Sequence, residues 1–170
     1  MATVGTEPAT PARPAPLMGL AIVLGIVAVL AGYIGLAVLL NIKAFWAGSV
    51  LAWYWFTVGQ GQLKALPAAV LGSLAGLAAA ALFTLPPTIL GGAGAWLGFA
   101  AVIVALWVLV MGWIPWVVNP AFMLMLTVAT IPAILGGKAF PGMAVGVCFA
   151  AAYLGGIVGA VQFLQSRKRA

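Results

Sequence analysis

The chain has 170 residues, of which 66% are hydrophobic and only 5% are charged, a composition outside the soluble range and typical of integral membrane proteins. It contains no histidine, one cysteine (Cys148) and one acidic residue (Glu7), so neither a cluster of metal ligands nor a pair of catalytic titratable groups can be assembled. The composition therefore predicts that the protein is not an enzyme and has no metal or cofactor. It also favours passive conduction, because ion-coupled transporters usually bind their ion with a membrane-embedded carboxylate or histidine.

The net charge of +6 comes from seven lysines and arginines, most of them at the ends of apolar segments. A nucleic-acid-binding surface needs a broad basic face in polar surroundings, and this chain has none. The basic residues instead fit the positive charge that flanks membrane spans on the cytoplasmic side.

The first half of the sequence predicts a tail and three helices. Residues 1–16 contain four prolines and are expected to be a disordered cytoplasmic tail. Residues 17–40 are apolar over 24 positions, too long for a signal-peptide core, and predict an uncleaved membrane helix. Residues 45–58 predict a second helix, short or partly unwound, which ends at a Gly-Gln-Gly-Gln run. Residues 65–85 predict a third span, with Pro67 in its first turn.

The second half predicts three more spans. After a turn at residues 84–88, the fourth extends from about residue 96, or from as early as residue 89, to residue 114. The fifth, residues 117–135, contains Asn119, Pro120 and Pro132 and should be kinked or broken. The sixth covers residues 141–164, and residues 165–170 form a basic cytoplasmic tail.

Six spans place both termini on one side of the membrane. With that side cytoplasmic, the inside holds Arg13, Lys64, Arg167, Lys168 and Arg169, against Lys43 and Lys138 outside. We therefore expect a multi-pass protein of the bacterial inner membrane with both termini in the cytoplasm.

A repeated motif links the two halves. The pattern K-A-x-P-x4-G occurs at residues 64–72 and again at residues 138–146, an offset of 74 positions. Because three crossings reverse the starting side, a repeated three-helix unit must be inverted. The predicted fold is an all-α membrane protein whose six transmembrane helices form two inverted three-helix repeats, residues 17–85 and 86–164. Similarity by chance is the alternative, because identity outside the motif is thin.

Short or interrupted helices at corresponding positions of inverted repeats point to a solute site. Helical spacing places one set of side chains on each of the second and fifth helices, and adding 74 to Ser49, Trp53 and Phe56 gives Met123, Thr127 and Thr130. The predicted solute path is lined by Ser49, Trp53, Phe56, Gln60, Asn119, Met123, Thr127 and Thr130. Trp53 and Phe56 would be constriction walls, and the hydroxyl and amide groups would be hydrogen-bonding stations. Alternatively, the hydroxyls bond to carbonyls of their own helices and the rings pack against lipid.

The run Phe45-Trp46-Ala47-Gly48, followed by Gln60-Gly61-Gln62-Leu63-Lys64, resembles a family of small polytopic bacterial inner-membrane proteins of unknown function. The similarity extends loosely over residues 17–159 and implies a polytopic inner-membrane protein without an established activity. The layout is also similar to that of urea, ammonium and formate/nitrite channels, which are homo-oligomers with a pore in each protomer.

The sequence thus predicts a passive channel or facilitator for a small neutral polar solute such as urea, an amide or ammonia. We expect its partners to be the lipid bilayer, that solute and further copies of the chain, a trimer being the first expectation. Two alternatives remain: a secondary transporter of an organic solute or weak acid, with Lys64 or Lys138 as charge partner, and a non-transporting accessory subunit whose glycine-rich helices dock another membrane protein.

Overall fold

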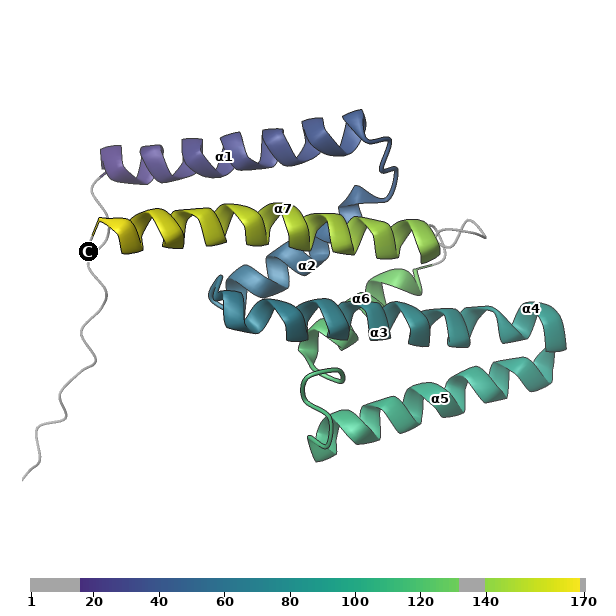
Figure 1. The fold of residues 1–170 in the computed structure, drawn as a ribbon. Coiled ribbons are helices and arrows are strands. Elements are labelled where there is room, and N and C mark those ends of the chain that lie inside the picture. The colour runs from purple at the N-terminus through teal and green to yellow at the C-terminus, as the bar shows by residue number, and fades with distance from the viewer. Residues whose placement is uncertain (1–15, 132–139, 169–170) are drawn as a thin grey trace, which may run out of the picture.

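A computed structural model describes residues 16–131 and 140–168, and these residues are folded entirely as helices and connecting turns (Figure 1). The elements in chain order are α1 (Pro16–Leu39), α2 (Phe45–Thr57), a short 3-10 helix η1 (Leu63–Ala65), α3 (Leu66–Thr84), α4 (Pro86–Leu90), α5 (Gly92–Met111), α6 (Pro120–Ala129) and α7 (Phe140–Arg167). The all-α prediction is confirmed. The predicted tail, residues 1–16, falls almost wholly outside the described residues, whereas α7 continues into the predicted basic tail as far as Arg167.

Four segments of the described chain are long and apolar enough to cross a membrane, which makes a multi-pass membrane protein the natural setting for this fold. They are Leu17–Leu39, Leu63–Leu90, Gly92–Met111 and Phe140–Arg167. α2 and α6 are shorter, with 13 and 10 residues. At 1.5 Å rise per residue they are about 20 Å and 15 Å long, less than the ~30 Å hydrocarbon core.

Local signals explain where the short helices end. After α2 the chain turns through Gln60 and Gly61, both with positive φ, and the indole Nε1 of Trp55 donates to the carbonyl of Gln62 at 2.8 Å. α6 begins at Pro120, where a missing N–H costs little, and the preceding Asn119 caps it. The turn predicted at residues 84–88 is in part the short helix α4.

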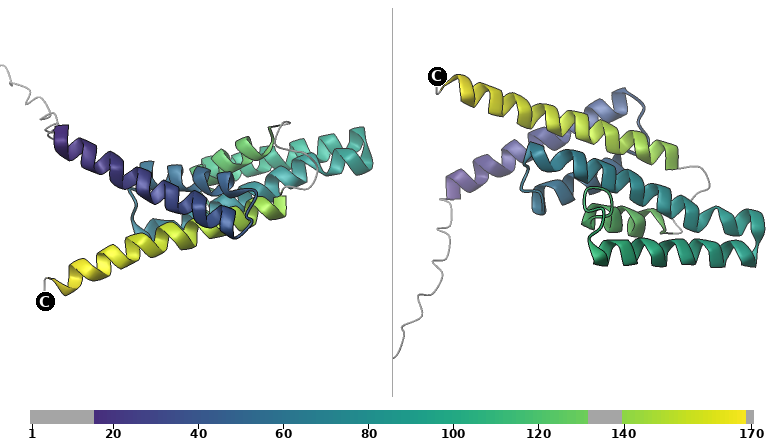
Figure 2. Two further views of the ribbon diagram at one scale, coloured as in Figure 1. Left: turned by 90° about the horizontal axis from the view of Figure 1, so that it is seen from above. Right: turned by 60° about the horizontal axis from the view of Figure 1, so that its bottom comes forward.

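The helices form two layers (Figure 1). α7 and α3 pass in front of α2 and α6, with α2 packed on α7 and α6 packed on α3. α1 flanks α7, and α5 flanks α3. α1 and α3 run in one direction, whereas α5 and α7 run in the other, and both ends of the described chain lie on the same side. α1 and α7 diverge towards the termini (Figure 2).

Small residues let the central helices approach closely. A side chain at Gly48 would meet the Gly146 carbonyl and Ala150, and one at Gly76 would meet the Phe122 carbonyl. Close contact of this kind is the usual basis of helix association in membranes. Four glycine pairs spaced four positions apart contact helices or turns of their own chain: Gly72/Gly76, Gly94/Gly98, Gly142/Gly146 and Gly155/Gly159.

The buried positions of the two halves correspond. Ala47, Gly48, Leu51 and Trp55 of α2 are buried, and so are the residues 74 positions later in α6, Ala121, Phe122, Met125 and Ala129. Five of the buried residues of α3 have buried counterparts in α7 at the same offset: Ala69 and Met143, Gly72 and Gly146, Ser73 and Val147, Gly76 and Ala150, Ala80 and Leu154. α1 and α5 do not share this agreement, since their buried residues occupy different positions.

Candidate functional site on α2 and α6

Three of the four residues predicted on α2 belong to that helix, and Gln60 follows it in the turn after Thr57. Ser49, Trp53, Phe56 and Gln60 are all exposed, with 61% of Trp53 and 48% of Phe56 accessible. Trp53 and Phe56 face away from the side of α2 that carries Ala47, Gly48, Leu51 and Trp55 and packs on α7 and α1. Ser49 lies next to Tyr33 of α1. Helical spacing therefore places Trp53 and Phe56 together on the outer surface of a single protomer, whereas the turn after α2 positions Gln60.

On α6, three of the four predicted residues share the equivalent face. Thr127 is exposed, and Met123 and Thr130 are half-buried, whereas the opposite side of α6 packs on α3. α2 and α6 also contact each other directly. Since α7 and α3 cover the same side of α2 and α6 in Figure 1, both faces point away from the α3/α7 layer. We call this surface, formed by Ser49, Trp53, Phe56, Gln60, Met123, Thr127 and Thr130, the α2/α6 face.

Asn119 is placed apart from the other predicted residues, because it is buried at the start of α6. Its Oδ1 accepts hydrogen bonds from the backbone N–H groups of Ala121 (2.9 Å) and Phe122 (3.2 Å). Its Nδ2 donates to the carbonyl of Ala68 in α3 at 2.9 Å. The side chain thus caps α6 and ties it to α3, and it lies directly against Gly72.

The threonines of the α2/α6 face donate to their own helix. The Thr127 hydroxyl donates to the Met123 carbonyl at 2.8 Å, and that of Thr130 lies 3.0 Å from the Leu126 carbonyl and 2.9 Å from the Thr127 carbonyl. These bonds match the alternative stated from the sequence, in which the hydroxyls bond to carbonyls of their own helices. A hydroxyl that donates its single hydrogen in this way still has an oxygen that accepts from outside.

Thr57 belongs to the same surface and was missed by the sequence analysis. It is exposed, and its hydroxyl donates to the Trp53 carbonyl at 2.7 Å. It follows Trp53 by four positions, and this spacing is the signal that would have found it.

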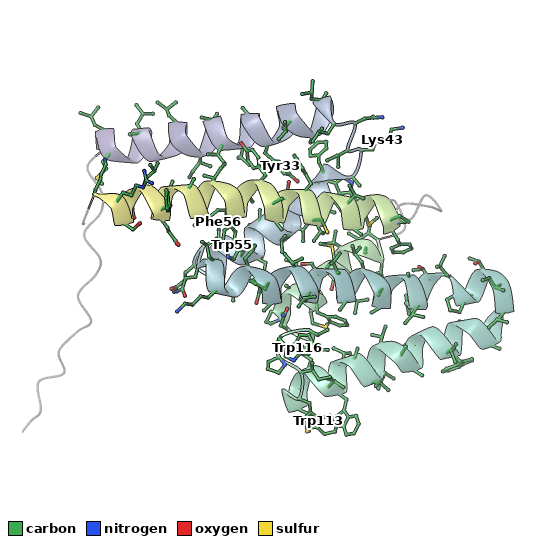
Figure 3. All side chains as sticks on the ribbon, in the orientation of Figure 1. Tyr33, Lys43, Trp55, Phe56, Trp113 and Trp116 are labelled. Carbon is green, nitrogen blue, oxygen red and sulfur yellow. The ribbon has the colours of Figure 1, made fainter. Side chains whose placement is uncertain are left out.

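A cluster of aromatic residues that the sequence did not predict holds α1 against the rest of the molecule. Figure 3 shows one of them, Tyr33, between α1 and α7. The Tyr33 hydroxyl donates to the Phe45 carbonyl at 2.6 Å, and the Tyr153 hydroxyl donates to the Val29 carbonyl at 3.1 Å. Tyr33 also stacks on Phe149, with ring centroids 5.2 Å apart. We call Tyr33, Phe149 and Tyr153 the aromatic clasp.

An open apolar groove of about 600 Å³ lies between the end of α3 and the start of α5. It is lined by Phe83, Thr84, Pro87, Ala95, Trp96 and Phe99. The only side-chain hydroxyl among these residues, that of Thr84, donates to the Ala80 carbonyl at 2.8 Å. The groove therefore offers apolar surface and no feature suited to a polar solute.

No family model, curated protein or solved structure matches the chain. The resemblance to small bacterial inner-membrane proteins gains no support from these comparisons. Within residues 16–131 and 140–168, no group of three or more His, Cys, Asp or Glu side chains could hold a metal ion.

Proposed function

We propose that this protein is a passive channel or facilitator for a small neutral polar solute of the urea, amide or ammonia class, embedded in the bacterial inner membrane. The distribution of polar side chains carries this proposal. α1 and α5 contain no serine, threonine, asparagine, glutamine or charged residue, as expected of helices that face lipid. Hydroxyl groups, an amide and aromatic rings instead gather on the exposed α2/α6 face.

The proposal includes an architecture of two inverted three-helix repeats, residues 17–85 and 86–164. The matching buried positions of α2 with α6 and of α3 with α7 support it, as do the opposite directions of α1 and α3 relative to α5 and α7 (Figure 1). Contacts between the halves also recur at the offset of 74. Gly72 lies against Asn119, and Gly146 lies against Phe45. These two contacts are equivalent, because Gly146 is the counterpart of Gly72 and Asn119 is the counterpart of Phe45.

In such an architecture the two short helices occupy equivalent places beside the pseudo-two-fold axis. Solute sites of inverted-repeat membrane proteins lie at short or interrupted helices in corresponding positions. α2 and α6 meet this description, and the α2/α6 face is therefore the candidate path.

Closure of the path needs further copies of the chain. Backbone and small side chains of the four central helices touch, as at Gly48 with Gly146 and at Gly76 with Phe122, which leaves little room for a solute between them. The α2/α6 face, by contrast, is open in a single protomer. We propose a homo-oligomer, a trimer as the first expectation, in which neighbouring copies enclose this face.

The proposed topology has both termini in the cytoplasm. The C-terminal end of α7, which holds Arg167, lies on the side of the termini, as does the connection between α2 and α3, which contains Lys64 (Figure 1). Lys43 lies at the opposite end of α1 (Figure 3). This distribution follows the excess of lysine and arginine on the cytoplasmic side of membrane proteins.

Swelling of proteoliposomes in an inward urea gradient tests the function. The wild-type protein should accelerate urea entry above the rate of protein-free liposomes, equally with and without a proton gradient. Trp53→Ala should abolish the acceleration, whereas Trp107→Ala, an exposed tryptophan on the lipid-facing α5, should retain it. Entry at the protein-free rate for the wild type would refute the channel, and entry that requires a proton gradient would indicate a secondary transporter instead.

A further inference from the structure

Three threonine hydroxyls on and beside the α2/α6 face have their hydrogens committed to the protein. Thr127 donates to Met123, Thr130 lies within bonding distance of the Leu126 and Thr127 carbonyls, and Thr57 donates to Trp53. A threonine hydroxyl has one hydrogen and two acceptor lone pairs. Towards the outside, these three side chains therefore act as hydrogen-bond acceptors only.

The aromatic side chains of the same face complement these acceptors. Trp53 and Phe56 are the counterparts of Thr127 and Thr130 at the offset of 74, so the ring-bearing stretch of α2 corresponds to the hydroxyl-bearing stretch of α6. Both ring systems are about half exposed or more. An aromatic face stacks favourably on a flat solute but supplies no strong hydrogen-bond donor at Phe56 and only the indole N–H at Trp53.

We infer that the threonine oxygens of the α2/α6 face select planar neutral solutes that donate N–H bonds, such as urea and simple amides, over formate, an anion of similar size that has no N–H group. A planar amide can direct its N–H groups to the threonine oxygens while its face stacks on Trp53 or Phe56. Formate offers oxygen acceptors alone, which the threonine oxygens repel, and its charge would lack a cationic partner on this face.

This inference rests on the proposed function and narrows it to one solute class. A valine at position 127 or 130 keeps the shape of threonine but removes the oxygen, whereas a serine keeps the hydroxyl and its intrahelical bond. The pair of replacements thus separates the hydrogen bond from the packing of the face.

The test measures entry of formamide, urea and formate into proteoliposomes that contain the full chain. The wild type should admit formamide and urea but leave formate entry at the protein-free rate. The double variant Thr127→Val/Thr130→Val should lose formamide and urea entry, and Thr127→Ser/Thr130→Ser, which keeps both oxygens, should recover entry relative to the valine variant. Circular dichroism and the melting temperature of each variant establish that it is folded.

The outcomes separate this inference from the proposed function. A wild type that admits none of the three solutes refutes the channel itself. A wild type that admits formate as readily as formamide, or a folded double-valine variant that conducts both amides normally, refutes the selection by acceptors while leaving the channel in place.

Discussion

At the scale of single residues, the contact of Asn119 with Gly72 joins the two halves of the chain. The Asn119 side chain makes three hydrogen bonds at the start of α6. It can do so only because Gly72 leaves room for it. Removing either partner should loosen the packing of α6 on α3.

We expect Asn119→Ala to destabilise the protein by about 1–3 kcal/mol, because it removes a helix cap and an interhelical hydrogen bond. Thr127→Ala should change stability by less than about 0.5 kcal/mol, since Thr127 is exposed and bonds only to its own helix. Thermal unfolding in detergent measures both. Equal melting temperatures for the two variants would contradict the role assigned to Asn119.

Gly72→Ala should also destabilise by about 1–3 kcal/mol, because its Cβ would overlap Asn119. Gly25→Ala on α1 is the matched control, since no other group lies within 4 Å of the added Cβ and alanine favours the helix. Cleavage by a protease during heating reports the difference. If the two variants resist alike, the close approach at Gly72 does not stabilise the fold.

The sequence predicted that Asn119 lines the solute path, whereas the structure shows it buried as the cap of α6. The bond of Asn119 to Ala68 spans 51 positions and depends on how α6 lies on α3, which no local pattern reveals. The threonine and aromatic positions were easier to group, because helical periodicity alone places them on one face.

At the scale of elements, the lengths of the apolar runs and the positions of proline and glycine were sufficient to predict where most helices begin and end. The first and third spans were predicted at residues 17–40 and 65–85 and are observed as Pro16–Leu39 and Leu66–Thr84. The fifth differs more, because Asn119 and Pro120 start α6 late, and residues 132–135 of the predicted span lie outside the described residues. The aromatic clasp was not predictable from the sequence, because Tyr33 and Tyr153, whose rings pack together, are 120 positions apart.

The aromatic clasp gives a prediction for α1. Tyr33→Phe and Tyr153→Phe each remove one hydrogen bond to a backbone carbonyl and should each cost about 0.5–1.5 kcal/mol of unfolding free energy. Tyr54→Phe is the control, because within the described ranges the Tyr54 hydroxyl donates no hydrogen bond to the protein. Denaturant titration in mixed micelles measures the three variants. A Tyr33→Phe variant as stable as Tyr54→Phe would show that ring packing alone holds α1.

At the scale of the whole molecule, the buried positions of α2 and α3 match those of α6 and α7 at one offset, and this offset was visible in sequence only as the motif K-A-x-P-x4-G. In the structure the agreement extends beyond this motif. Buried positions of α2 and α3 are buried again in α6 and α7, although most residue types differ. Burial depends on size and polarity rather than identity, which explains why sequence identity between the halves is thin.

The proposed inverted repeats predict on which side of the membrane each connection lies. Reporter fusions after residue 168 should be cytoplasmic, whereas fusions within residues 40–44 and after residue 131 should lie across the membrane. Alkaline phosphatase and a fluorescent protein are complementary reporters of the two sides. Fusions at residues 42 and 168 that report the same side would contradict the inverted repeats.

The central claim is that solute crosses along the α2/α6 face, and a steric block at that face tests it most directly. Ser49→Trp places an indole on the exposed face of α2, and Val104→Trp places one on the exposed surface of α5, where Val104 is 55% accessible. Stopped-flow light scattering of proteoliposomes then measures urea entry. We predict that Ser49→Trp reduces entry to the rate of protein-free liposomes while Val104→Trp leaves it at the wild-type rate. Wild-type urea entry through a folded Ser49→Trp variant would contradict the claim.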